Sequence, residues 1–157
     1  MDLSRRGFLG SGLAALGSAG LRAAPSERFF ALHPFIEANP KAVFIRRTNV
    51  AGRLDFAGMR REGLNLGRSI FQAKSEGGIP LSHRVVLKPN VLTRREHGTQ
   101  VNWGTDPDFY DGLLTSLHET GLRRFHYVEA NYRSSRWSTK YDEIHERLGV
   151  DVLDPQR

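Results

Sequence analysis

Four polar residues follow two apolar runs of the sequence, in positions where their side chains could do chemistry. They are Lys88, Asn90, Glu129 and Asn131. The first two follow residues 84–87, and the other two follow residues 124–128. If these runs are neighbouring parallel strands, all four residues lie at the same edge of the sheet, because parallel strands end at the same edge. Open α/β sheets bind ligands in the crevice outside that edge.

Lys88 and Glu129 are the candidate catalytic residues of this expected site. A lysine and a carboxylate can act as general acid and base when a substrate lies within hydrogen-bond reach. Pro89 fixes its own backbone angle and biases Lys88 toward an extended conformation, which would hold the ammonium at the crevice edge. Burying that charge is costly unless an anion meets it. We therefore expect a small anionic ligand, with Asn90 and Asn131 as ligand-binding residues. A strand that simply ends in a polar loop is the alternative interpretation.

Residues 104–107 (GTDP) predict the start of a helix close to this edge. Asp106 is a good N-cap, and the proline after it suits the first helical position. The backbone amides of a helix start can bind an anion, so Thr105 and Asp106 are further candidate ligand-binding residues. Arg94 and Arg95 could add positive charge to such a site. The carboxylate of Asp106 would compete with the anion.

A metal site is an alternative that the sequence leaves open. The residues that could converge on a metal are Glu96, His97, Asp106, Asp108 and Glu129. Imidazole and carboxylate ligands suit zinc, iron or manganese. However, no two histidines have the spacing of a metal-binding helix pair. We therefore predict no metal-ligating residue, and the sequence identifies no cofactor.

Composition narrows the remaining classes. The chain has 157 residues, 39% hydrophobic and 25% charged, which fits a single globular domain. It contains no cysteine, which excludes disulfides, thiolate zinc sites and cysteine-ligated iron–sulfur clusters. The net charge of +6 favours anionic partners without selecting one. Arginines near Trp137 could contact nucleic acid, but no recognition motif accompanies them, so we expect no nucleic-acid partner.

Strand and helix signals alternate along the chain. Strands are predicted at residues 42–45, 84–87, 124–128 and 150–153, and helices from Asp55 to about Gln72, from Pro107 to a C-cap at Gly121, and at residues 141–148. This order predicts an α/β fold with a mostly parallel sheet and flanking helices. The apolar run at 84–87 predicts burial on both faces of that sheet. Three glycines weaken the first helix prediction, and residues 93–104 are predicted to be an irregular loop.

Residues 4–9 (SRRGFL) and the apolar run after them are typical of an export signal. A short basic head, an apolar stretch too short to span a bilayer comfortably and small residues after it describe a signal peptide. The paired arginines resemble a twin-arginine (Tat) signal. We assign residues 1–24 to this signal, residues 25–40 to a lead-in segment whose aromatic side chains pack on the body, and residues 41–157 to an α/β domain. The Tat translocation machinery is the expected partner, and the periplasm or another exported location is the expected destination. No stable membrane insertion is expected after cleavage, with an uncleaved anchor as the alternative.

An ordered set of motifs resembles the domain of unknown function 362 family. The set consists of VLKPN at 86–90, GTDP at 104–107, Glu119-x-Gly121 and a strand that ends in Glu129. The resemblance implies an α/β fold with a site at Lys88, and it implies no defined reaction. The family's domain usually continues beyond the point where this sequence stops, so we expect an incomplete, truncated member that forms the N-terminal part of such a domain. Whether the chain is an enzyme, a non-catalytic binding or accessory protein, or a remnant of a larger domain stays open.

Replacing Arg5 and Arg6 together by lysine should block export. The Tat pathway reads the arginine pair itself, so a substitution that keeps both charges removes the signal while leaving the apolar run intact. Cell fractionation of the variant should therefore find the chain retained in the cytoplasm. Undiminished periplasmic accumulation would contradict the Tat assignment.

Overall fold

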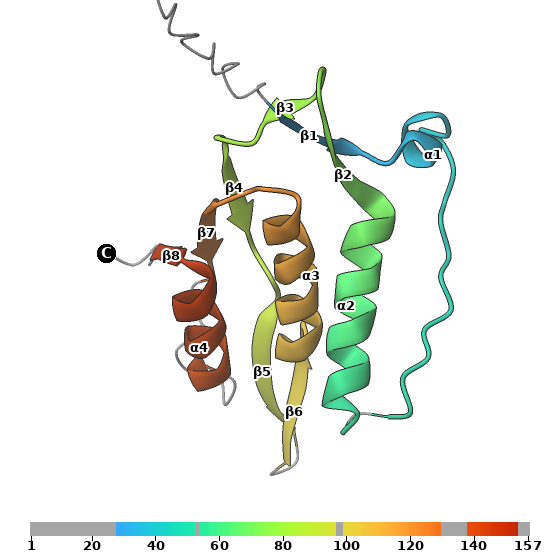
Figure 1. Ribbon diagram of the computed structural model, residues 1–157. Coiled ribbons are helices and arrows are strands. Elements are labelled where there is room, and N and C mark those ends of the chain that lie inside the picture. The colour runs from blue at the N-terminus through green and yellow to red at the C-terminus, as the bar shows by residue number, and fades with distance from the viewer. Residues whose placement is uncertain (1–27, 53, 97–98, 130–137, 154–157) are drawn as a thin grey trace, which may run out of the picture.

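The computed structural model describes residues 28–52, 54–96, 99–129 and 138–153. Helix α2 spans Phe56–Ile70, α3 spans Pro107–Glu119 and α4 spans Ser138–Leu148. α3 and α4 lie against a parallel sheet and α2 packs on α3, with an antiparallel sheet at one end and a β-hairpin at the other (Figure 1). The chain therefore has the mixed α/β character that the sequence predicts.

The parallel sheet carries the strands on which the predicted site depends. It consists of β4 (Arg84–Leu87), β7 (Arg124–Val128) and β8 (Val150–Leu153), in that spatial order. β7 pairs in parallel with β4 on one side and with β8 on the other. Helix α3 connects the first pair and α4 the second, so each connection is a β–α–β unit. The three predicted strands are confirmed, and so is the parallel pairing of β4 with β7.

The core lies between this sheet and the helices. Its buried members are Val91, Tyr110, Leu114, Leu117, Leu122, Phe125, Tyr127, Tyr141, Ile144 and Val150. Phe125 and Tyr127 project from the central strand β7 and have no exposed surface. Each fully buried side chain of this size stabilises the fold by about 1.5–3 kcal/mol. Burial of β7 by α3 and α4 is thus the main apolar contribution to this part of the fold.

The opposite face of the parallel sheet is more exposed. Burial alternates along β4, with Arg84 and Val86 exposed and Val85 and Leu87 partly buried. The side chain of Val86 is 63% exposed, and that of Leu153 on β8 is 47% exposed. The prediction that residues 84–87 are buried on both faces is therefore wrong. β4 is an edge strand, and the described helices pack against one face of its sheet.

Helices α2 and α3 pack backbone to backbone at glycine positions. A Cβ atom on Gly63 would lie 2.0 Å from the carbonyl oxygen of Phe109. A Cβ atom on Gly112 would lie 1.9 Å from the carbonyl oxygen of Arg60. Gly67 meets a serine side chain of α3 at similarly short range. Two of the three glycines that weaken the helix prediction, Gly63 and Gly67, are therefore residues through which α2 docks on α3.

Capping residues fix the ends of the helices. Asp55 caps α2 by accepting a hydrogen bond from a backbone N–H of the first turn, and Asp106 caps α3 in the same way. The C-cap of α3 is Thr120, one residue before the predicted position, and Gly121 follows it with φ of 109°. Gly149 follows α4 with φ of 64°. Both glycines adopt the left-handed region that commonly ends a helix.

The lead-in segment contributes to an antiparallel sheet. This sheet consists of β1 (Phe29–Leu32), β2 (Phe71–Lys74) and β3 (Ile79–Pro80), and the short helix α1 (Pro34–Glu37) follows β1. Gly77 and Gly78, between β2 and β3, both have positive φ. The rings of Phe30 and Phe71 lie 4.9 Å apart between centroids and pack against the core. Phe30 thus packs on the body as predicted.

Residues 93–104 form most of a β-hairpin, which makes the prediction of an irregular loop wrong. β5 (Val91–Glu96) and β6 (Thr99–Gly104) pair antiparallel, with Val91 opposite Gly104. Backbone hydrogen bonds join such strands, and these bonds need no apolar periodicity in the sequence.

Residues 42–45, predicted as a first strand, belong to no strand. Val43 is 86% exposed and Ile45 is 93% exposed. The preference of such residues for strands reflects packing against a neighbouring strand, and no described strand pairs with this segment. The strand prediction is wrong because the segment has the right residues without a partner.

The parallel part of the fold is smaller than predicted. Among the described residues, β4, β7 and β8 form a parallel sheet, whereas the sheet around β1 and the β5–β6 pair are antiparallel. The expected mostly parallel sheet is therefore limited to three strands. The difference comes from β1, β2, β5 and β6, whose antiparallel pairings the sequence did not predict.

Replacing Gly63 by alanine should lower the free energy of unfolding by about 1–3 kcal/mol, because the new methyl group meets backbone atoms that cannot move aside independently. Alanine normally stabilises a helix relative to glycine, so the sign of the change tests the close contact. Chemical denaturation measures it. Gly52→Ala is the control, since a Cβ atom there would have no neighbour within 4 Å. A stabilised Gly63→Ala variant would contradict the packing of α2 on α3.

Candidate functional site

Lys88 and Glu129 form an ion pair across the ends of β4 and β7. The Lys88 Nζ atom lies 3.2 Å from Glu129 Oε2 and donates a hydrogen bond to it. The Lys88 side chain is 70% exposed, whereas that of Glu129 is 10% exposed. The predicted convergence of these two residues is therefore present in the structure, with the carboxylate enclosed and the ammonium displayed to solvent.

Strand register brings the two side chains together. Leu87 is paired with Tyr127 in the parallel ladder, so Lys88 leaves β4 beside the end of β7. Glu129 follows Val128, the last residue of β7. Pro89 is buried directly after Lys88. The pairing of residues 41 positions apart in the sequence thus follows from two parallel strands that end together.

Asn90 and Thr105 lie together beyond the end of β4. The backbone N–H of Thr105 donates a hydrogen bond of 2.6 Å to the carbonyl oxygen of Asn90. The Tyr141 hydroxyl donates one of 2.9 Å to the carbonyl oxygen of Thr105. Tyr141 belongs to α4, so this helix fixes the chain that enters α3. Sequence reasoning missed this role, because Tyr141 gave a signal only as the first residue of a predicted helix.

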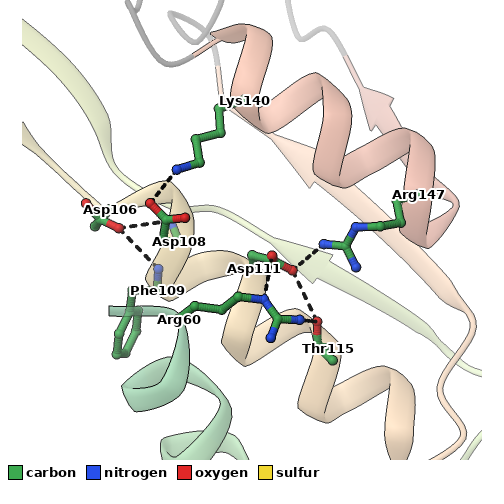
Figure 2. Close-up of polar contacts among 8 residues, drawn as sticks. All are labelled: Arg60, Asp106, Asp108, Phe109, Asp111, Thr115, Lys140 and Arg147. Carbon is green, nitrogen blue, oxygen red and sulfur yellow. Dashed lines mark hydrogen bonds and ion pairs between the residues drawn. The ribbon is translucent and has the colours of Figure 1, made fainter. Parts of the chain in front are cut away.

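Asp106 acts as a helix cap. Its Oδ1 atom accepts hydrogen bonds from the backbone N–H groups of Asp108 at 2.9 Å and Phe109 at 3.2 Å (Figure 2). These are the amides that an anion at the start of α3 would need. The competition expected from the sequence is therefore resolved in favour of the Asp106 carboxylate, and the predicted ligand-binding role of Asp106 has no support in this geometry.

Lys140 joins the three helices near the start of α3. Its Nζ atom lies 2.5 Å from Asp108 Oδ2 (Figure 2), and 4.8 Å from the centre of the Phe56 ring on α2. A cation over an aromatic face is attracted by the ring electrons. Sequence reasoning missed Lys140, since a lysine before a helix carries no signal of its distant partners.

Asp111 is held between two arginines from neighbouring helices. Arg60 on α2 donates to its Oδ2 atom at 2.9 Å, and Arg147 on α4 donates to its Oδ1 atom (Figure 2). Thr115 donates a further hydrogen bond of 3.1 Å. Burial acts to raise the pKa of Asp111, but the hydrogen bonds and charges of Arg147 and Arg60 outweigh it and lower the pKa. The carboxylate therefore stays ionised and ties α3 to both neighbours.

An aromatic cluster lies between α3, α4 and β7. It consists of Tyr110, Tyr127, Tyr141 and His145. The Tyr110 hydroxyl lies 3.3 Å from His145 Nε2, within hydrogen-bond distance. Burial raises the pKa of both Tyr110 and Tyr141, and burial lowers the pKa of His145 to about 4 against the opposing charge of Asp142. Tyr110, Tyr141 and His145 are therefore neutral near pH 7, and the rings of the cluster pack around Tyr141.

Some predicted positions fall outside the described residues. Asn131 and His97 lie there, and the side chains of Arg94 and Arg95 are likewise not described. Among the residues that are described, no group of three or more histidine or carboxylate side chains is placed to hold a metal ion. A search of the same residues for a long apolar helix able to cross a bilayer found none.

Comparisons with protein families, curated proteins and solved structures found no match to this chain. The roles of its residues are therefore argued from the geometry of this chain. That geometry singles out the Lys88–Glu129 pair, which joins two strands, and the contacts of Tyr141, Lys140 and Asp111, which fix the helices around it.

His145 should make the fold sensitive to acid. The unfolded chain takes up a proton on this histidine near pH 6.5, whereas the folded chain does so near pH 4. The free energy of unfolding should therefore fall as the pH is lowered between these values, by up to about 3 kcal/mol. His145→Gln keeps a neutral hydrogen-bonding side chain and should flatten this dependence in denaturation curves measured from pH 7 to pH 4.

His83→Gln is the matched control, since His83 is exposed. This variant should keep the pH dependence of the unchanged chain. An equally steep acid destabilisation of His145→Gln would assign the effect to other groups.

Proposed function

We propose that this chain is an exported α/β protein that binds a small anionic ligand at the carboxyl edge of its parallel sheet. The observation that carries the proposal is the Lys88–Glu129 pair, 3.2 Å apart between Nζ and Oε2 at the ends of β4 and β7. This edge is where open α/β sheets bind their ligands. The +6 net charge of the chain also favours anionic partners.

The unequal exposure of the two partners supports a ligand-binding role. Glu129 is 10% exposed and Lys88 is 70% exposed. In the Arg68–Glu119 pair on the helices, by contrast, both side chains are about half exposed, at 54% and 45%. An enclosed carboxylate holds the ammonium in one place, and an exposed ammonium can meet a ligand.

The hydrogen-bond capacity of Lys88 leaves room for a ligand oxygen. An ammonium group has three N–H donors, and one of them is directed to Glu129. The remaining donors can bind a carboxylate or phosphate by charge-assisted hydrogen bonds, which are stronger than neutral ones. If the ligand is a substrate, the same pair can take up or release a proton at Lys88 Nζ and Glu129 Oε2. The proposal therefore includes general acid–base catalysis by these two residues, with Asn90, Thr105 and Asn131 contributing ligand contacts.

Export and family membership belong to the same proposal. The SRRGFL segment at residues 4–9 supports delivery to the periplasm by the Tat machinery. The VLKPN and GTDP motifs support a relationship to the domain of unknown function 362 family. In the described structure these motifs lie at the end of β4 and the start of α3.

A non-catalytic binding or accessory role is the second candidate function. The exposure of Val86 at 63% and Leu153 at 47% on one face of the parallel sheet favours it. Parallel sheets are usually covered on both faces, so an exposed apolar face suits a protein that works against a larger partner or a domain that is part of a larger whole. In this role the ion pair would order the sheet edge without handling a ligand.

Thermal-shift measurements with inorganic phosphate and acetate test the proposal. Either anion should raise the melting temperature of the unchanged chain, since a ligand at a hundred times its dissociation constant stabilises by about 2.7 kcal/mol. Lys88→Ala should lose this shift. Lys74→Ala is the matched control and should keep it, because Lys74 lies on β2 of the other sheet and forms its own ion pair of 2.6 Å with Glu37 of α1.

Two outcomes would reject ligand binding at Lys88. One is an unchanged melting temperature of the parent chain with every anion. The other is an equal shift in the Lys88→Ala variant. Either result would leave the accessory role as the better account of the pair.

A further inference from the structure

Residues 41–47 form an exposed segment with the composition of a strand. The sequence is KAVFIRR, in which three strand-forming residues stand between basic ones. In Figure 1 the chain between α1 and α2 runs extended along the outer side of α2. Every residue of the segment is exposed. We call residues 41–47 the edge segment.

The edge segment has one side toward the body and one toward solvent. The Phe44 ring lies 5.7 Å from the Phe35 ring between centroids, and Arg46 forms an ion pair of 3.4 Å with the buried Glu62. Successive side chains of an extended chain point to opposite sides. Val43 and Ile45, which are 86% and 93% exposed, therefore share the solvent side. Lys41 and Arg47 continue the same alternation, so two apolar residues are flanked by two cations.

Strand β8 offers a complementary edge. It is the outer strand of the described parallel sheet, and its other side pairs with β7. On its exposed face the Asp151 side chain is 77% exposed and Leu153 is 47% exposed. The adjoining helix α4 exposes Glu143 and Glu146. β8 thus presents an apolar residue and a carboxylate, next to a helix that exposes two glutamates and Arg147.

We propose that a second copy of this chain docks here, with its edge segment added as a strand to β8. Within the edge segment the Ala42 N–H donates to the Asn39 carbonyl oxygen, and an added strand would gain ladder hydrogen bonds for the residues after it. Lys41 or Arg47 would face Asp151, and Val43 and Ile45 would cover Leu153. Addition of an extended segment to a sheet edge is a common mode of recognition, in which the main chain supplies affinity and alternate side chains supply specificity.

Charge selects β8 over the other edge of the parallel sheet. β4 is the opposite edge strand and carries Arg84, with Lys88 directly after it. Lys41 and Arg47 would meet like charges there, and like charges placed directly opposite each other destabilise a strand pair.

The two complementary surfaces lie on opposite sides of the molecule, so the association is head to tail. Figure 1 shows the chain between α1 and α2 at one side of the helix layer and β8 at the other. An edge segment that reaches β8 of a neighbour leaves the neighbour's own edge segment unused. Such a contact repeats from copy to copy and closes only if the rotation between copies forms a ring.

Sedimentation velocity of the whole chain over a range of concentrations and salt tests the proposal. The unchanged chain should associate, and added salt should weaken the association. Ile45→Asp and Asp151→Lys should each raise the dissociation constant by about tenfold or more, as loss of an interfacial contact or charge pair does. Leu54→Asp and Glu76→Lys are the matched controls, since both side chains are exposed and lie outside the two surfaces. These controls should associate like the parent.

Mixing the two disabled variants distinguishes a head-to-tail contact from a symmetric one. The Asp151→Lys copy keeps its edge segment and the Ile45→Asp copy keeps its β8 edge, so an equimolar mixture should form dimers and nothing larger. A parent chain that is monomeric at every concentration would overturn the proposal. Protection of the edge segment from hydrogen exchange, or its binding to anionic vesicles, would not change that conclusion. Association that both variants retain, or a mixture that stays monomeric, would also overturn the proposal.

Discussion

The close approach of α2 and α3 is the constraint on which the rest of the described fold depends. Gly63 and Gly112 bring the backbones of the two helices into direct contact, with no side chain between them. At this distance the Arg60 side chain on α2 can form a short ion pair with Asp111 on α3. Asp111 also binds Arg147, so the position of α4 follows from that of α3. The helix layer in turn sets where the capped start of α3 lies relative to the ends of β4 and β7.

Local signals in the sequence predict a large part of this arrangement. Apolar runs predict β4, β7 and β8, and the cap residues Asp55 and Asp106 place the starts of α2 and α3 within one residue. Right-handed β–α–β connectivity then makes β4 and β7 parallel neighbours. From that pairing the meeting of Lys88 and Glu129 follows without knowledge of any other contact.

The remaining features depend on partners that are distant in the sequence. Glycine in a helix reads as a weak helix former until the backbone of α3 is known to lie against it. The β5–β6 hairpin is held by backbone pairing, which leaves little trace in side-chain pattern. Tyr141 contacts Thr105, and Lys140 contacts Asp108, each more than 30 positions away in the sequence. No local motif predicts these contacts. For residues 42–45 the error is the opposite one. Their composition predicts a strand, but no described strand pairs with them.

The order of core residues along the chain also affects biosynthesis. The buried cluster begins at Val91 and ends at Val150, on the last described strand. The residues before Val91 therefore emerge from the ribosome before the residues of this core have been synthesised. Domains fold as units while they are made, and this core lacks its last described strand until Val150 has been translated. Under the proposed export route, the leader emerges first, and the cargo behind it reaches a transportable shape only after β8 has left the ribosome.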